Sequence, residues 1–240
     1  MKLLSDALLG FLAGLVITLG ATAYLSLEST MAGALMFTVG LFAICSFGWN
    51  LFTGKVCYSF GKGWRYIGFL AVVWLSNFAG AAAGGALVRL TRLTGVVERA
   101  QALAATKLGD SLLSVFVLAI FCNILIYIAV EGYRSIPHEL GKYLAVFFGV
   151  TVFVVCGFEH CIANMYYFTA AGAWFGAGAG MTNPFVFILV NTLGNVVGGL
   201  LIPAVTGGET CSTLTCIPLQ RYTSAAAVRT TRARPCASWV

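Results

Sequence analysis

Long apolar runs constrain this chain more than any other feature. Each run contains about twenty residues or more, enough for a helix to cross a hydrocarbon core of about 30 Å. The runs are continuous rather than alternating, so they predict helices and not half-buried strands. The sequence therefore predicts an all-α integral membrane protein with six transmembrane helices, at about residues 7–27, 31–53, 66–88, 111–130, 143–170 and 184–205.

Composition leads to the same class. Hydrophobic residues make up 60% of the chain and charged residues only 9%, which leaves too little polar surface to cover a core in water. Asp6 interrupts the start of the first run, which is also longer than the apolar region of a signal peptide. We therefore expect this run to be retained as a span, the alternative being a cleaved signal peptide.

The net charge of +6 does not indicate a nucleic-acid partner. Much of it lies in loops that flank the apolar runs and in a Ser/Thr-rich tail, rather than in a basic stripe on a soluble domain. The expected organisation is a six-helix transmembrane domain at 1–205, followed by a basic tail at 206–240 that is either disordered or non-native. Cys211 and Cys216 have no histidine nearby, so neither a metal site nor a cofactor is expected.

Basic residues in the loops predict the orientation in the membrane. With the N-terminus inside, ten basic residues face the cytoplasm and four face outward. The inner set is Lys2, Lys55, Lys62, Arg65, Arg134, Lys142, Arg221, Arg229, Arg232 and Arg234, and the outer set is Arg89, Arg92, Arg99 and Lys107. Both termini are therefore expected on the cytoplasmic side of the cytoplasmic (inner) membrane.

Two pairs of similar segments suggest an internal repeat. The segment "CSFGWNLFTGKV" (45–56) resembles "CGFEHCIANMYY" (156–167) at an offset of 111 residues. The segment "NFAGAAAGG" (77–85) resembles "NTLGNVVGG" (191–199) at an offset of 114 residues. Two matches at nearly one offset favour a repeat over chance similarity between Gly/Ala-rich helices.

The repeats would cover about residues 1–100 and 105–205, with three spans in each. Because three is odd, the second copy must cross the membrane in the opposite direction. Inverted repeats of this kind are typical of channels and secondary transporters, whose site lies between the repeats near the midplane. The glycines shared by the paired segments have a structural explanation, since small residues let helices approach closely.

Adjacent ionisable residues in the fifth run, Glu159 and His160, mark the expected site. Such groups at membrane depth are costly and usually face a cavity or a partner. Together with Gly157 and Asn164 they form a polar cluster that predicts a break in the fifth helix. The segment 46–54 predicts a matching break in the second helix.

These residues carry a resemblance to a known family. The strings "VFVV", "GFEHCIANMYY", "LFTG", "FCNILIYIAVEG" and "NTLGNVVGG" resemble the formate/nitrite transporter family, which includes formate, nitrite and hydrosulfide channels. The resemblance covers about residues 5–203. It implies a homopentamer of aquaporin-like protomers in the lipid bilayer, each with its own pore. Helices two and five would be broken, and two hydrophobic constrictions would enclose a chamber with one histidine.

The resemblance also assigns roles along the substrate pathway. His160 matches the family's central histidine and Thr53 the threonine on the loop of the second helix. Asn123 and Asn195 match asparagines that line the pore. Lys107 falls where relatives carry a vestibule lysine, and we expect it to attract the anion. From the residues alone, His160 could instead be a satisfied buried histidine, and Lys107 could mark a membrane boundary.

Other residues have supporting roles. Phe37, Leu41 and Phe153 fall where the family places its constriction residues. A carboxylate exposed to an anion pore would repel the substrate, so Glu159 is expected to anchor the loop. Asn164 is expected to assist in this by capping the broken helix.

The expected function is a channel for small monovalent anions of weak acids: formate, nitrite or hydrosulfide. A bare anion pays a heavy desolvation cost in an apolar constriction, whereas a histidine that titrates near pH 6.5 can supply a hydrogen bond or a proton at the midpoint. The alternatives are a proton-coupled transporter of the same anions and a non-transporting membrane scaffold. No P-loop, paired catalytic carboxylates or catalytic triad occurs in the sequence, so an enzyme is not predicted.

Overall fold

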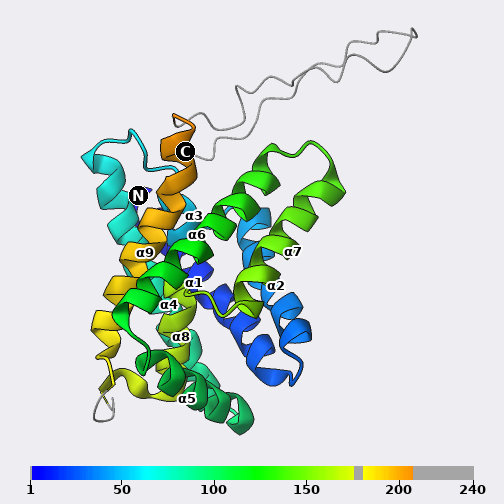
Figure 1. The fold of residues 1–240 in the computed structure, drawn as a ribbon, viewed down its shortest axis with the longest axis vertical. Coiled ribbons are helices and arrows are strands. Elements are labelled where there is room, and N and C mark those ends of the chain that lie inside the picture. The colour runs from blue at the N-terminus through cyan, green and yellow to red at the C-terminus, as the bar shows by residue number, and fades with distance from the viewer. Residues whose placement is uncertain (1, 176–180, 208–240) are drawn as a thin grey trace, which may run out of the picture.

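Helices form all of the regular secondary structure in the part of the chain that the computed structural model describes, residues 2–175 and 181–207 (Figure 1). The predicted all-α class is therefore confirmed. In chain order the elements are α1 (Lys2–Ser26), α2 (Thr30–Phe47), α3 (Phe52–Val56), α4 (Trp64–Arg89), α5 (Thr94–Leu108), α6 (Leu112–Ser135), α7 (Glu139–Val155), α8 (Cys161–Ala171), the 3-10 turn η1 (Ala173–Phe175) and α9 (Pro184–Val205). The tail from residue 208 onward lies outside the described residues.

Five helices among these are long and apolar enough to cross a membrane: α1, α2, α4, α6 and α9. The fifth predicted run is instead divided between α7, with 17 residues, and α8, with 11. Each of the six predicted runs thus contains at least one apolar helix. The start of α1 and the end of α9 lie at the same end of the bundle (Figure 1).

Glycine ends the helix at each of the two interruptions. Gly48, with φ of 74°, follows α2, and Gly157, with φ of 68°, follows α7. A left-handed residue at this place closes a helix, and glycine adopts that conformation without a Cβ clash. The chain then runs extended before α3 and α8 begin, so both interruptions fall inside the segments expected to be broken.

Helix packing follows the same order in the two halves. Helix α1 packs against α2 and α4, as α6 packs against α7 and α9, and α2 meets α7 across the middle. The register of both predicted pairings is wrong, however. Gly48 corresponds to Gly157, and Phe52 to Cys161, at an offset of 109 residues rather than 111.

Asn77 corresponds in its hydrogen bonds to Asn195, which is one helical turn beyond Asn191. Glycines recur at every turn of both helices, so the two sequences match equally well when the second is shifted by four residues. That shifted match pairs Asn77 with Asn191.

Helix α5 was not expected from the sequence, because residues 89–110 are too polar for a span. It lies across the end of the bundle opposite the start of α1 (Figure 1). Its buried residues recur every four positions, which gives one apolar face against α8 and α1. The last of its turns carries Lys107.

Glycines allow the long helices of each half to pack at close range. A Cβ at Gly80 in α4 would overlap the Phe11 carbonyl oxygen of α1, and one at Gly198 in α9 would overlap the Ile120 carbonyl oxygen of α6. These positions thus repeat one packing device in both halves.

Replacing Gly80 with alanine is expected to destabilise the protein by about 1–3 kcal/mol, because the added methyl must push two helix backbones apart. Thermal unfolding of the purified protein in detergent measures this. Gly68→Ala is the control on the same helix, since a Cβ there meets nothing within 4 Å. Equal melting temperatures of the two variants would contradict the close-packing explanation.

Candidate functional site

The starts of the two half-helices meet at the centre of the bundle. His160 is the N-cap of α8 and Thr53 is the second residue of α3. Their side chains are 3.0 Å apart, from Nε2 to Oγ1, and both residues are buried. The two residues that the resemblance placed in the pore are thus in direct contact, although they are 107 positions apart in the chain.

Backbone geometry fixes the direction of the hydrogen bonds through His160. The Ala163 N–H donates to Nδ1 at 3.2 Å, so Nδ1 carries no proton. In the neutral ring Nε2 then carries the proton and donates it to the Thr53 hydroxyl oxygen. The hydrogen of that hydroxyl remains free for another acceptor. The arrangement therefore offers a hydroxyl donor at the centre of the protein.

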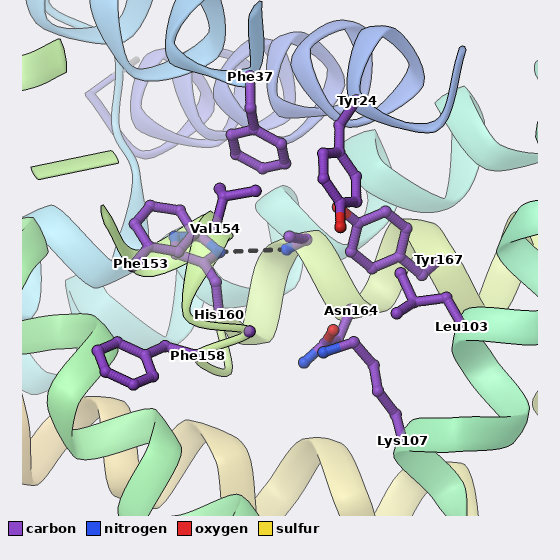
Figure 2. A pocket seen from close by; sticks show the side chains of 12 residues that line it. Tyr24, Phe37, Leu103, Lys107, Phe153, Val154, Phe158, His160, Asn164 and Tyr167 are labelled. Carbon is purple, nitrogen blue, oxygen red and sulfur yellow. Dashed lines mark hydrogen bonds between the residues drawn. The ribbon is translucent and has the colours of Figure 1, made fainter. Parts of the chain in front are cut away.

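A small cavity of about 50 Å³ lies beside His160 (Figure 2). The Phe153 ring stacks on the imidazole with centroids 5.7 Å apart, and Phe37 meets Phe153 edge-on at 5.8 Å. Tyr24 and Tyr167 line the same cavity. Since one water needs about 10–15 Å³ on a comparable measure, the cavity holds only a few atoms. Its walls are largely apolar, with the imidazole of His160 and the ammonium of Lys107 among them.

Leu41 is the third expected constriction residue. It is buried at 1% exposure but does not line this cavity, whereas Val154 and Phe158 do. The structure therefore brings Phe37 and Phe153 together at His160 and leaves Leu41 farther along α2. Its role in a constriction stays a prediction.

Lys107 and Glu159 form an ion pair at the edge of the cavity. The ammonium Nζ lies 2.7 and 2.6 Å from the two carboxylate oxygens, and the side chains are 10% and 5% exposed. Asn164 donates a further hydrogen bond of 2.6 Å to Glu159. The carboxylate is thus held by three bonds. Its role in anchoring the loop stays a prediction.

Two details differ from the sequence interpretation. The side chain that caps α8 belongs to His160, while Asn164 bonds to Glu159 instead. Lys107 is paired, so any attraction that it exerts on an anion is offset in part by Glu159. The anion-attracting role of Lys107 remains a prediction, now for a neutral pair rather than a lone cation.

The two expected pore asparagines are placed differently. Both amide hydrogens of Asn195 are used, by the Ala119 and Glu159 carbonyls, and its Oδ1 accepts from the Cys161 N–H. Asn123 donates from Nδ2 to the Thr53 carbonyl at 3.1 Å, while its buried Oδ1 has no partner among the described residues. Asn195 therefore secures the loop of His160, and Asn123 contacts the Thr53 side of the centre.

Asn77 was missed as a site residue. It is fully buried and bonds to the loop before α3, close to Thr53. A signal was present in the sequence, because Asn77 and Asn195 each begin an N-x-x-G string. Pairing the strings four residues out of register concealed it.

Metal-ligating residues do not cluster within residues 2–175 and 181–207 in any group of three or more. The five cysteines of these ranges, Cys45, Cys57, Cys122, Cys156 and Cys161, are free thiols. Cys211 and Cys216, considered above, lie outside the described residues.

The fold and the site together define an integral membrane transport protein. Long apolar helices surround two half-helices that start at a buried polar centre, and non-helical backbone at membrane depth is tolerated where protein or a cavity surrounds it. A model of the formate/nitrite transporter family matches residues 1–207. The chain belongs to the formate/nitrite transporter family.

Individual relatives agree with this assignment. The chain is 32% identical to the uncharacterized transporter YrhG of Bacillus subtilis, over 80% of this chain and 79% of that protein. It is 27% identical to formate channel FocA of Haemophilus influenzae, over 80% and 81%. Among solved structures it is similar to a pentameric formate channel with formate bound, with a TM-score of 0.75 and 25% identity over 86% of this chain and 96% of that one.

Proposed function

We propose that this protein is a channel that passes small monovalent anions of weak acids (formate, nitrite or hydrosulfide) across the cytoplasmic membrane. The observation that carries the proposal is the buried His160–Thr53 pair, which joins the starts of α3 and α8 beside a cavity of about 50 Å³. Similarity to a protein named formate channel and to a structure with formate bound supports the substrate class.

The size of the cavity supports a substrate of a few atoms. Its apolar walls make a bare anion costly, because a desolvated charge loses its hydration without compensation. A weak acid can cross such a wall close to its neutral form. The Thr53 hydroxyl and the His160 ring then replace part of its hydration at the narrowest point, without holding it tightly.

Electrostatics favour entry of an anion from the α5 side. Lys107 lines the cavity, and its ion pair with Glu159 offsets part of its attraction for an anion, which prevents a deep trap. Helix α8 points its N-terminus at the centre, and the first turn of a helix carries partial positive charge. Together Lys107 and the start of α8 attract the anion only moderately near His160, so that it can also leave quickly, as conduction requires.

The proposal includes the assembly and its orientation. The protein forms a homopentamer in which each protomer carries its own pore. The transmembrane domain of a protomer covers about residues 1–205, with inverted repeats at about 1–100 and 105–205. Both termini face the cytoplasm. The pentameric structural relative and the basic residues of the loops support these statements.

Flux into liposomes tests the proposal. Purified full-length protein is expected to pass formate, nitrite and hydrosulfide faster than empty vesicles do, at the same external pH. An absence of flux above empty vesicles would favour the scaffold alternative. Accumulation of the anion against its gradient, driven by an imposed pH gradient, would show a proton-coupled transporter instead.

A further inference from the structure

We propose that Asn77 is a positioning residue for the Thr53–His160 pair; this inference rests on the proposed function of that pair. Asn77 lies on α4 and is 0% exposed. Its Oδ1 accepts from the Phe52 N–H at 2.8 Å, and its Nδ2 donates to the carbonyls of Gly10 and Asn50 at 2.7 and 2.8 Å. One side chain thus ties three helices and the first loop together beside Thr53.

The second half of the protein repeats this arrangement bond for bond. Asn195 accepts from the Cys161 N–H at 2.9 Å and donates to the Ala119 and Glu159 carbonyls, both at 2.8 Å. In each half the asparagine side chain accepts from the N–H of the first residue of the half-helix. It donates to the loop carbonyl two residues before that residue and to a carbonyl of the first long helix of that half. We call this arrangement the amide clamp: Asn77 holds the half that bears Thr53, and Asn195 the half that bears His160.

Helix α3 depends on its clamp because it has little stability of its own. It has five residues, and its N-cap, Leu51, supplies no side-chain hydrogen bond. The Phe52 N–H is one of the donors that a helix start leaves unsatisfied, and burial makes an unpaired donor costly. Asn77 supplies the missing acceptor from a neighbouring helix, and so fixes the backbone immediately before Thr53.

The direction of Thr53 follows from this backbone. Its hydroxyl must lie within reach of Nε2 of His160, at 3.0 Å, and its carbonyl accepts from Asn123. If α3 turned or frayed at its start, the hydroxyl would leave the imidazole. Asn77 therefore acts on the substrate through Thr53 and does not line the cavity beside His160.

Two cysteines serve as native reporters of the clamps. Cys57, directly after α3, is 1% exposed and its thiol donates to the Thr53 carbonyl at 3.2 Å. Cys161, the first residue of α8, is 0% exposed. Each thiol lies beside one clamp, so the reactivity of the two can be compared within one molecule.

The test uses Asn77→Leu in the full-length protein, with N-ethylmaleimide labelling of each cysteine followed by peptide mass spectrometry. Loss of three buried hydrogen bonds is expected to raise the labelling rate of Cys57 about tenfold while Cys161 stays protected. Asn191→Leu is the matched control, because Asn191 is also fully buried but its amide atoms have no partner within the described residues. Unchanged protection of Cys57 would overturn the proposal.

Formate flux then separates positioning from general stability. Asn77→Leu is expected to lower flux about tenfold, and to lower it little further when Thr53→Val is already present, because both changes remove the same contact. If the double variant instead loses flux by the product of the two single losses, Asn77 does not act through Thr53 and the proposal is wrong. Should Asn77→Leu fail to fold, Asn77→Asp keeps the acceptor for Phe52 and loses the donors. A wild-type protein without flux would refute the channel function, whereas labelling of Cys57 still tests the clamp.

Discussion

Replacing Lys107 with methionine is expected to destabilise the protein by about 3–5 kcal/mol, because it leaves the Glu159 carboxylate buried without a counter-ion. The carboxylate side chain is only 5% exposed, so water cannot take over the role of the ammonium. Asn164 would remain as a neutral donor, which is insufficient for a buried charge. Thermal unfolding in detergent and the yield of assembled protein measure the loss.

A second substitution tests the cause. Adding Glu159→Gln to Lys107→Met removes the unpaired charge, and the double variant is expected to recover most of the lost stability. Lys142→Met is the control, since Lys142 pairs with Glu139 at 3.7 Å where the carboxylate side chain is 74% exposed. A surface pair of this kind contributes about 0–1 kcal/mol. If Lys107→Met melts like the control, the buried pair does not stabilise the fold as argued.

The same double variant separates the two roles of Lys107. It is expected to restore the fold without either charge, so its formate flux reports on what the charged pair contributes to entry of the anion. Flux equal to that of the wild type would leave Lys107 and Glu159 a purely structural pair.

Much of this protein can be predicted from the sequence because a bilayer allows few solutions. Continuous apolar runs imply helices, and the polar cluster around Gly157 implies a break in one of them. The prediction that His160 belongs to the functional site follows from the cost of placing an ionisable group at that depth. These inferences depend on local composition, so a single sequence contains what they need.

The roles of individual amides could not be predicted in the same way. Asn195 and Asn123 look equivalent in the sequence. Asn195 nevertheless donates both amide hydrogens, to α6 and to the loop, whereas the Oδ1 of Asn123 has no partner in the part of the chain that the structure describes. The difference depends on which carbonyls of distant helices lie within 3 Å. The capping of α8 by His160 rather than Asn164 has the same origin, because it follows from the extended backbone at residue 160.

Replacing His160 with asparagine is expected to change the pH response of formate flux. Asparagine is a good N-cap, so its oxygen can accept from the Ala163 N–H and keep α8 in place. It has no group that titrates in this range and does not reach Thr53 as the ring does. The substitution therefore removes the imidazole chemistry while preserving the local fold.

The measured quantity is the ratio of variant to wild-type flux from about pH 4 to about pH 7.5, a range that extends well below the titration of an unperturbed imidazole because the ring is buried. The fraction of neutral formic acid changes equally for both proteins and cancels in the ratio. Since Nδ1 accepts a backbone N–H, the neutral ring fits this site, and the deficit of the variant is expected to be about tenfold larger at the higher pH. Thr53→Val is the control: it removes the partner of Nε2 but keeps the ring, so it should lower flux and retain the wild-type pH profile. A ratio close to one at every pH would mean that His160 acts only as a cap, and a deficit that widens toward acid pH would make the imidazolium the working form.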